Sequence, residues 1–433
     1  MKENYENKHH ILYLILDGIG DLPHPSIENK TPLEAAKTPN LDLLAKNGCM
    51  GQVITVGKGI APQSDIAVFN MLGYNFRNIP YVGRGVVESI GCNIDFKEGD
   101  LALRGNFATV DTDMNIVDRR AGRIITKEEA KSICNTFNEK IVLQDPDAEV
   151  TVVPTIAHRV TIRFRHKKQK LSENITNTDP AYDKVNGIGI AKTDIKQMKV
   201  LECKPQDNQN SAQITANIIN DFTKQVVLLS KNHSVNQSRV ERNLNPMNCI
   251  LVRDAGTKFP NYEPINKKYG LHTACMVDMP VEIGISKILG MDTIETGGIN
   301  DYEKKALVAA EKLHDYNLIY VHIKGPDEFG HDGDAIGKMH NIQDIDSRFI
   351  KNFISNISID NYVVVISGDH STPCVKKSHS DDPVPLLVSG NLVLNDESLR
   401  FTETCAKKGI IGTIMGSDVI NKSLKLISNN KSN

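Results

Sequence analysis

Four short segments of this sequence hold a high density of residues that can bind metal ions or act as nucleophiles. The segments are ILDGIGD with Asp17, APQSDIAVFNMLGY with Ser64, KGPDEFGHDGD with Asp327 and His331, and ISGDHSTPCVKKSHSDDPVP with Asp369, His370 and His379. Carboxylate and imidazole ligands suit Mn, Zn, Mg or Fe, and no thiolate is needed. Asp, His and His on one side and Asp, Asp, His and a serine oxygen on the other would make a two-metal site, whose ions typically lie about 3.5 to 4 Å apart.

Taken singly, each of these residues also has a structural explanation. Asp17 before Gly18 could close a strand as an Asx turn, and Ser64 could simply cap a helix. Asp327 and His331 could lie in a surface loop. A serine at a helix N-terminus is nevertheless where an alkoxide and a phosphate are favoured, because unpaired N–H groups point there. Adjacent Asp369 and His370 at the end of a buried strand would be costly unless they were paired or metal-bound.

The elements that carry these residues alternate between strands and helices. Apolar runs predict strands at 11–16, 271–277, 318–323, 361–367 and 385–389. Amphipathic patterns predict helices from Pro39 to Gly48, at 303–316 and over roughly 335–356. This alternation predicts a parallel sheet covered by helices, and ligand sites gather at the carboxyl ends of such strands.

The middle of the chain has a different texture. Alternating strand-like stretches and more arginine occupy 95–200, followed by a polar linker at 202–212. We therefore expect a second domain inserted into the first, with its exit near 255–265. The 433 residues are 40% hydrophobic and 24% charged, which excludes a disordered or fibrous protein.

Bulk charge gives no sign of a polyanion partner. Lys and Arg number 51 against 53 Asp and Glu, and no long basic run appears, so we expect no nucleic-acid binding. The apolar run near the N-terminus is too short for a membrane span or a signal sequence. The eight cysteines are scattered, which suits reduced thiols, and we expect a cytoplasmic protein without a membrane partner.

Many segments together resemble the alkaline phosphatase superfamily and, within it, the archaeal type of 2,3-bisphosphoglycerate-independent phosphoglycerate mutase. The resemblance runs through TPLEAAKTPNLDLLAKNG, SDIAVFNMLGY, GRGVVESIG, LRGNFATVD, DRRAGR, TDPAY, KYGLHTACMV, KGPDEFGHDGD and SGDHSTPC with SHSDDPVPLLVSG. It implies an α/β fold: an alkaline-phosphatase-like, mostly parallel sheet flanked by helices, with an inserted α+β cap. The implied boundaries are 1–85 and 262–433 for the core, and 86–261 for the phosphotransferase cap.

The resemblance also assigns the ligands and the nucleophile. It implies that Asp327, His331 and His379 hold one metal, and that Asp17, Ser64, Asp369 and His370 hold the other. Ser64 would be the nucleophile, activated by metal coordination rather than by a dedicated histidine base. The implied cofactors are two divalent ions, with Mn²⁺ preferred and Mg²⁺, Zn²⁺ or Co²⁺ as alternatives, and no bisphosphoglycerate.

A mutase must also retain the glycerate while phosphate moves between its hydroxyls. Arginines grip carboxylates and phosphates bidentately. In the expected cap they cluster in DRRAGR and HRVTIRF, and each could instead belong to a solvated basic face. The candidates are Asp118 as acid or base, and Arg119, Arg123, His158, Arg159, Arg84, Lys324 and Arg253 as substrate-binding residues, with Arg120 and Arg163 nearby. His322, on the strand LIYVHI, is expected to be a packed histidine.

The implied activity is an isomerase that interconverts 3-phosphoglycerate and 2-phosphoglycerate through a phosphoserine, in glycolysis or gluconeogenesis. One rival is a phosphatase or another phosphomutase of the same superfamily, which the metal ligands and Ser64 cannot distinguish. A second rival is a catalytically silent metal-binding scaffold, which would tolerate the loss of a ligand. The sequence leaves self-association into a homo-oligomer open.

Overall fold

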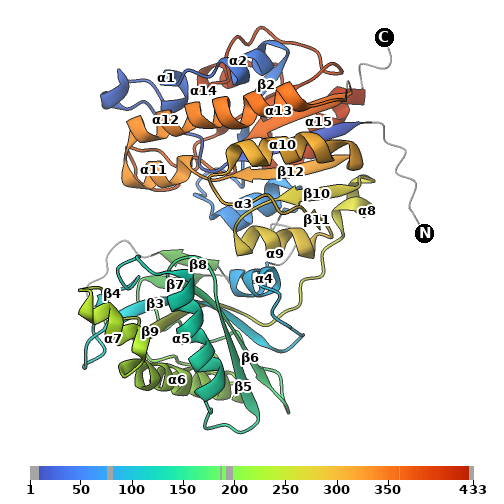
Figure 1. Ribbon diagram of the computed structural model, residues 1–433. Helices are drawn as coiled ribbons and strands as arrows, with labels where there is room; N and C mark the ends of the chain where they lie inside the picture. Colours follow the sequence, from blue (N-terminus) through green and yellow to red (C-terminus); the bar gives the residue numbers. More distant parts are fainter. Residues whose placement is uncertain (1–8, 76–80, 186–187, 192–197, 360, 429–433) are drawn as a thin grey trace. The chain divides into compact units, whose positions relative to one another are not determined.

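The computed structural model describes residues 9–75, 81–185, 188–191, 198–359 and 361–428, and the chain divides into two compact units. The first unit comprises Met1–Pro80, Glu263–Asp278 and Leu289–Asn433, and the second comprises Tyr81–Tyr262 and Met279–Ile288. Each unit has its own sheet, and Figure 1 labels the elements of both.

The division differs from the expected boundaries at residues 81–85 and 262, which fall in the second unit, and at one helix. Residues 279–288 fall in the second unit, whereas the expected core included them. The reason is close packing between α9 (Pro280–Ile288) and α4 (Arg84–Gly91). Gly91 lies against the carbonyl of Pro280, and Gly284 lies against the carbonyl of Val87, with no room for a Cβ at either glycine. The two backbones can approach this closely only because both positions are glycine.

The first unit is built on an eight-stranded sheet within the described residues. Its strands, in spatial order, are β11 (Asp292–Thr293), β10 (Thr273–Met276), β12 (Leu318–Ile323), β1 (His10–Leu16), β13 (Tyr362–Ser367), β14 (Val384–Ser389), β2 (Gly48–Ile54) and β15 (Gly412–Met415). β1 pairs in parallel with both β12 and β13, so segments about 300 residues apart meet at the centre of the sheet. The predicted α/β class with a mostly parallel sheet is confirmed.

Helices cover both faces of this sheet. They are α1 (Pro32–Ala35), α2 (Pro39–Lys46), α3 (Ser64–Met71), α8 (Ile265–Tyr269), α10 (Tyr302–Lys312), α11 (Pro326–Asp332), α12 (Ala335–Ile345), α13 (Lys351–Asn356), α14 (Glu403–Lys408) and α15 (Val419–Ser428). Leu12, Leu14 and Leu16 join one buried core with side chains of α2, α10, α12 and α13. Ile11 and Tyr13 point to the other face, toward α15. This two-sided burial explains why β1 is a continuous apolar run.

Most of the predicted elements are confirmed, but one strand runs in the other direction. β14 is antiparallel to both of its neighbours, β13 and β2. The connection from β13 to β14, residues 368–383, contains no crossover helix, and a parallel pair would need one. The expected helix at 335–356 is continuous, with a π-helical stretch at Asp346–Ile350 between α12 and α13.

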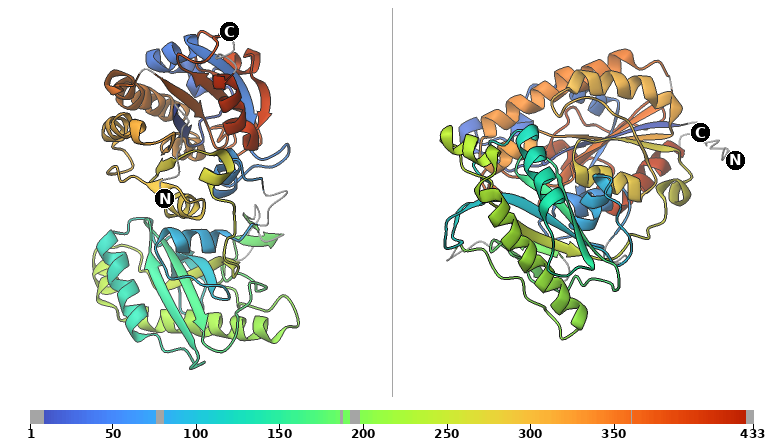
Figure 2. Two further views of the ribbon diagram at one scale, coloured as in Figure 1. Left: turned by 90° about the vertical axis from the view of Figure 1, so that its right-hand side faces the viewer. Right: turned by 60° about the horizontal axis from the view of Figure 1, so that its bottom comes forward.

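The second unit has a five-stranded sheet in the described part of the chain. Its strands are β3 (Leu101–Val110), β4 (Ile116–Asp118), β5 (Ala148–Pro154), β6 (Arg159–His166) and β9 (Cys249–Gly256), and β7 (Tyr182–Val185) forms a separate hairpin with β8 (Ile188–Ala191). Its helices are α4, α5 (Lys127–Lys140), α6 (Asn210–Lys231), α7 (Ser234–Glu241) and α9. α5 and α6 lie against this sheet (Figure 2), and Phe137 and Phe222 of these helices join its buried core. The described strand pairings of the sheet are antiparallel, so this unit is α+β.

None of the described helices is both long enough and apolar enough to cross a membrane.

Candidate active site

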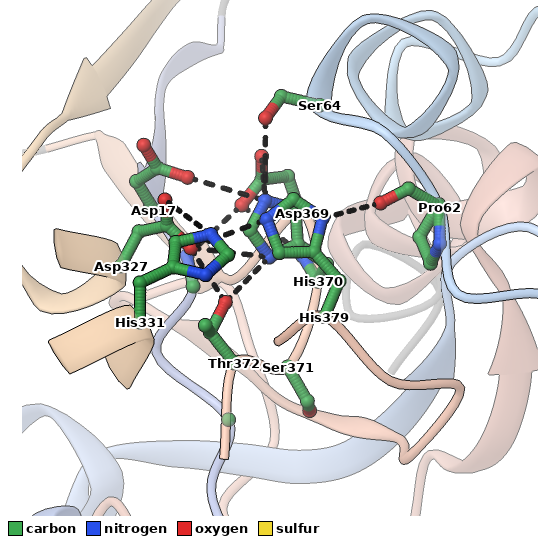
Figure 3. Close-up of polar contacts among 12 residues, drawn as sticks. Asp17, Pro62, Ser64, Asp327, His331, Asp369, His370, Ser371, Thr372 and His379 are labelled. Atoms are coloured by element: carbon green, nitrogen blue, oxygen red, sulfur yellow. Dashed lines mark hydrogen bonds and ion pairs between the residues drawn. The ribbon is translucent and has the colours of Figure 1, made fainter. Parts of the chain in front are cut away.

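The predicted metal ligands of the first unit converge at one edge of its sheet (Figure 3). Asp17 directly follows β1, Asp327 and His331 lie on α11 after β12, and Asp369 and His370 follow β13. Because β12, β1 and β13 are adjacent and parallel, their carboxyl ends lie at the same edge of the sheet. His379 joins the group from the loop that leads to β14.

Asp327 is the centre of one group of donors. His379 Nε2 lies 3.4 Å from Asp327 Oδ1, and His331 Nε2 lies 3.6 Å from Asp327 Oδ2. His379 Nδ1 is 2.7 Å from the carbonyl of Pro62, and His331 Nδ1 is 3.2 Å from the carbonyl of Lys377. A carbonyl can only accept, so each Nδ1 carries a proton and each Nε2 points toward Asp327, where it can bind a metal ion once it has lost its own proton. Outer carbonyls orient metal-binding histidines in this way.

Asp17 and Asp369 form the second group of donors. His370 Nε2 lies 3.4 Å from Asp17 Oδ1 and 3.2 Å from Asp369 Oδ2. Neither of these two buried oxygens accepts a hydrogen bond from any described residue. The other oxygen of Asp17 accepts from Lys324 Nζ at 2.7 Å. Lys324, predicted to bind substrate, thus contacts a predicted metal ligand.

The surroundings shift the pKa values of the three carboxylates in different directions. Burial, and then the neighbouring charge of Asp17, hold the pKa of Asp369 well above its usual value. Burial also raises the pKa of Asp17, but Lys324, His322 and His370 outweigh it, and the pKa of Asp17 is lowered overall. The pKa of Asp327 is lowered because hydrogen bonding and charge from the histidines outweigh its burial. Asp369 is therefore the carboxylate of the group whose charge is least compensated.

The residues fit divalent metal ions. The donor atoms form two sets, and within each set all of them lie within 4.8 Å of one another. One set is Asp327 with His370 and His379, and the other is Asp17 with His322 and Asp369. Oxygen and imidazole donors of this kind suit Mn, Zn, Mg or Fe. His370 lies between the sets, since it is also 3.9 Å from Asp327 Oδ1, whereas the sequence assigned it to the ion of Asp17.

His322 is the main difference from the expected ligand set. It is fully buried, as expected of a packed histidine, but its Nε2 lies 3.8 Å from Asp369 Oδ2 and 3.9 Å from Asp17 Oδ1. The signal in the sequence is a histidine one residue before the end of an otherwise apolar strand, at the edge where the ligands gather.

Ser64 is the first residue of α3, and Gln63 is the N-cap. The Ser64 Oγ lies 3.3 Å from His370 Nε2 and so faces the donor cluster. Ser64 is therefore not the N-cap residue, which was the structural alternative for this serine. The helix N-terminus also favours an anion beside this hydroxyl.

The predicted arginines of the second unit belong to a separate charged cluster. Arg119 donates to Asp179 at 2.7 and 3.2 Å, and Arg253 donates to Asp179 at 3.2 Å. Arg253 and Arg119 also lie over the ring of Tyr182, at 4.3 and 5.4 Å from its centroid. Asp179 is completely buried, and the sequence analysis did not single it out although it lies in the motif TDPAY.

A second carboxylate in this unit, Glu88, binds two more guanidinium groups. Arg84 lies 2.9 Å and Arg104 lies 3.0 Å from Glu88 Oε1, and Arg104 also contacts Asp254 at 3.3 Å. Arg104 was not predicted. Its signal is an arginine inside the strand LRGNFATV, whose other side chains are small or apolar apart from Asn106 and Thr109.

Arg159 and His158 lie among these cations. Burial, and then Arg104 and Arg84, lower the pKa of Arg159 to about 10. Burial, and then Arg159 and Arg120, lower the pKa of His158 to about 3. Both shifts mean that the folded protein disfavours further positive charge here, which is the environment that an anionic ligand would relieve.

The remaining predicted residues are engaged differently. Both oxygens of Asp118 accept hydrogen bonds, from the backbone of Arg120 and Gly122 and from Asn245, and shape the turn that carries DRRAGR. Arg123 is exposed at the end of that turn. Arg163 is buried and bound to Glu149 and Thr151.

A mostly parallel sheet that gathers carboxylates, imidazoles and a serine at its carboxyl edge defines the class of α/β metalloenzymes. A family model described as 2,3-bisphosphoglycerate-independent phosphoglycerate mutase matches residues 45–236. A protein of that name from Aeropyrum pernix is 38% identical, over 96% of this chain and 99% of its own. One from Methanosphaera stadtmanae is 36% identical, over 94% and 96%. The chain belongs to the family of 2,3-bisphosphoglycerate-independent phosphoglycerate mutases.

Solved structures agree with this assignment. A cofactor-independent phosphoglycerate mutase from Thermoplasma acidophilum superimposes with a TM-score of 0.63 and 28% identity, over 96% of this chain and 99% of its own. A Pyrococcus horikoshii protein superimposes with a TM-score of 0.77 and 27% identity, over 97% of each chain. Family membership makes the chain an isomerase.

Proposed function

We propose that the chain interconverts 3-phosphoglycerate and 2-phosphoglycerate through a phosphorylated Ser64, without bisphosphoglycerate. The observation that carries the proposal is Ser64 Oγ, which begins a helix and faces His370 Nε2 at 3.3 Å within a cluster of three carboxylates and four histidines. A poor nucleophile thus lies beside donor groups suited to divalent cations.

The proposed metal ligands are Asp327, His331 and His379 for one ion and Asp17, Ser64, Asp369 and His370 for the other, with Mn²⁺ preferred. The bound ions would lower the pKa of the Ser64 hydroxyl and offset the charge of the phosphoryl group. The Nδ1 protons of His331 and His379 are bound by carbonyls, so Nε2 is the atom of each ring that would bind the metal ion. Lys324 holds Asp17 and offers a cation to the phosphoryl oxygens.

The chemistry consists of two transfers that mirror each other. Ser64 Oγ forms a bond to phosphorus while the ester bond of the substrate breaks, so Ser64 loses a proton and the departing glycerate oxygen gains one. The second transfer returns the phosphoryl group to the other hydroxyl and restores Ser64. We assign the exchange of these protons to Asp118, and the binding of the glycerate carboxylate to Arg119, Arg123, His158, Arg159, Arg84 and Arg253.

The arginine cluster of the second unit supports an isomerase over a phosphatase. Among the described residues, three carboxylates pair with this group: Glu88, Asp179 and Asp254 bind Arg84, Arg104, Arg119 and Arg253, and Arg159 lies beside them. A site that retains glycerate between two transfers needs such cations for the carboxylate. A phosphatase, which releases the alcohol, does not.

The test is to incubate purified, metal-replenished protein with 3-phosphoglycerate and to measure 2-phosphoglycerate and free phosphate together. We expect 2-phosphoglycerate with little phosphate, and loss of activity by at least about 10³-fold in Ser64→Ala and after EDTA treatment. Ser423→Ala is the control, because Ser423 is buried on α15 and bonds only its own helix through Val419. Phosphate release without isomerisation would make the protein a phosphatase, and full activity of Ser64→Ala would refute the phosphoserine.

Two finer expectations belong to the same proposal. Adding single divalent ions to EDTA-treated protein should restore the highest activity with Mn²⁺. The reaction would belong to glycolysis or gluconeogenesis in the cytoplasm. Self-association, which the sequence left open, is measured by sedimentation of the purified chain.

A further inference from the structure

The hydroxyl of Thr372 joins the two groups of metal-binding donors. Thr372 Oγ1 lies 2.6 Å from Asp327 Oδ1 and 3.0 Å from His370 Nδ1. Asp327 is the centre of one donor group, and His370 Nε2 faces both oxygens of the other. The side chain is completely buried, so water does not compete for these two contacts.

The directions of the two hydrogen bonds follow from the single proton of the hydroxyl. A carboxylate can only accept, so the Thr372 O–H donates to Asp327. Thr372 Oγ1 then has only lone pairs left, and it accepts from His370 Nδ1–H. The proton of His370 is therefore on Nδ1, and Nε2 presents its lone pair toward Asp17, Asp369 and Ser64.

This arrangement matches the other two histidines of the cluster. His331 and His379 donate their Nδ1 protons to the carbonyls of Lys377 and Pro62, which are fixed acceptors. His370 differs because its outer partner is a hydroxyl, which could donate or accept. Thr372 accepts from His370 only because its own proton is donated to Asp327. The orientation of His370 therefore depends on Asp327.

The backbone around Thr372 leaves the side chain no freedom to turn away. Its N–H donates to the carbonyl of Gly20, and its carbonyl accepts from the buried Lys338 at 3.0 Å. Gly330 lies against the Thr372 side chain and carbonyl with no room for a Cβ. Lys338 also pairs with the buried Asp21 at 2.7 Å, which ties the loop after β1 to the loop after β13.

We propose that Thr372 is a positioning residue: it clamps Asp327 and His370 together and fixes His370 with Nε2 as the metal-binding atom. The inference rests on the proposed two-metal function of this site, but concerns metal affinity rather than turnover. It predicts that metal binding depends on the hydroxyl at this position and not on the shape of the side chain.

The test measures Mn²⁺ binding to EDTA-treated protein by calorimetry, in the absence of substrate. Thr372→Val keeps the branched shape and removes the hydroxyl, and we expect at least one ion to bind about 10- to 100-fold more weakly. Thr372→Ser keeps the hydroxyl and should bind both ions within about threefold of the unaltered protein. Thr273→Val is the matched control, since Thr273 is buried on β10 and its hydroxyl makes no hydrogen bond to a described residue.

A second measurement needs no variant of Thr372 that might unfold. In Zn²⁺-loaded protein with ¹⁵N-labelled histidine, the ring signals of His370, assigned by their loss in His370→Asn, should show a protonated Nδ1 and a metal-bound Nε2. A proton on Nε2 would overturn the proposal. So would unchanged metal affinity in Thr372→Val, affinity as weak in Thr372→Ser as in Thr372→Val, or no metal binding by the unaltered protein.

These outcomes are separate from those of the proposed function. A protein that shows the expected order of metal affinities but does not isomerise phosphoglycerate supports the role of Thr372 and refutes only the activity. A protein that isomerises phosphoglycerate with unchanged metal affinity in Thr372→Val refutes only the role of Thr372.

Discussion

The charged cluster of the first unit has uncompensated negative charge, and that of the second unit has uncompensated positive charge. In the first, Asp17, Asp327 and Asp369 crowd together, and the pKa of Asp369 is raised by burial and by Asp17. In the second, the pKa of Arg159 falls to about 10 through burial and its arginine neighbours. One cluster is short of cations and the other is short of anions. A divalent cation would supply the charge that the first cluster lacks, and a phosphorylated hydroxy acid, with its phosphate and free carboxylate, would supply the charge that the second lacks.

The largest effect is expected from Asp369→Asn, which removes a carboxylate from the cluster that is short of cations. Metal affinity should fall at least about 100-fold and activity by a similar factor, because a ligand is lost. The metal-free protein should become more stable, because a carboxylate with a raised pKa is removed. Calorimetry with Mn²⁺ and thermal unfolding in EDTA measure the two changes. Asp315→Asn, on the surface, should change neither, and equal destabilisation by both variants would contradict the comparison.

The next effect is expected from Asp179→Asn, which removes an anion from the cluster that already lacks anions. Arg119 and Arg253 would lose a buried partner at 2.7 and 3.2 Å, and we expect a loss of about 3 kcal/mol in unfolding free energy. Urea denaturation measures this loss, and metal affinity should stay unchanged. Asp95→Asn is the control, because that carboxylate is 68% exposed where it pairs with Arg165. A loss below about 0.5 kcal/mol would show that the arginines do not need Asp179.

A smaller effect is expected from Arg159→Met, the mirror image of Asp369→Asn. The KM for phosphoglycerate should rise about 10- to 100-fold, in line with the loss of one hydrogen bond to a charged group. The substrate-free protein should be at least as stable, because one of several like charges is removed. Steady-state kinetics and thermal unfolding test the two statements. The control is Arg165→Met, because the guanidinium of Arg165 is bound by Asp100 and Asp95 in the unaltered protein. An equal rise in KM in this control would refute a specific role of Arg159 in substrate binding.

The smallest effect is expected from Glu403→Gln, which tests a buried carboxylate of the first unit outside the cluster. Burial raises the pKa of Glu403 to about 7 despite a hydrogen bond from Thr31. The folded protein therefore binds more protons than the unfolded chain between its ordinary pKa and about 7, and its stability falls as pH rises through that window. The variant should lose about 2 kcal/mol less stability than the unaltered protein between pH 5 and pH 8. Thermal unfolding at both pH values measures this difference, and parallel curves would refute it.

The sequence predicts that the candidate ligands of the first unit come together, because each of them lies close to a strand end in the chain itself. Asp17 and Asp369 follow apolar runs directly, and a parallel sheet brings such ends together. The direction of β14 was predicted wrongly because an apolar run carries no information on orientation. His370 lies near both donor groups, 3.4 Å from Asp17 Oδ1 and 3.9 Å from Asp327 Oδ1, and no spacing in the sequence records these distances.

The charged cluster of the second unit was less predictable because strand register creates it. Arg104 and Arg253 are paired residues of β3 and β9, separated by about 150 positions in the chain. Like charges directly opposite each other are unfavourable, and Asp254 lies between the two guanidinium groups at 3.3 and 3.6 Å. No local pattern indicates that register. A buried arginine in an apolar strand is the only warning that the sequence contains.

The central position of β1 has a consequence for how the chain folds. β1 pairs with β12 and β13, whose residues follow about 300 positions later, so the first sheet cannot form until most of the chain has been synthesised. The second unit is almost continuous in sequence and lacks only α9 when Tyr262 has been added. We expect the second unit to acquire structure first, while β1 waits as an unpaired apolar strand. During that interval the strand HILYLIL is the segment most exposed to aggregation, and its protection in the cell is a task for chaperones.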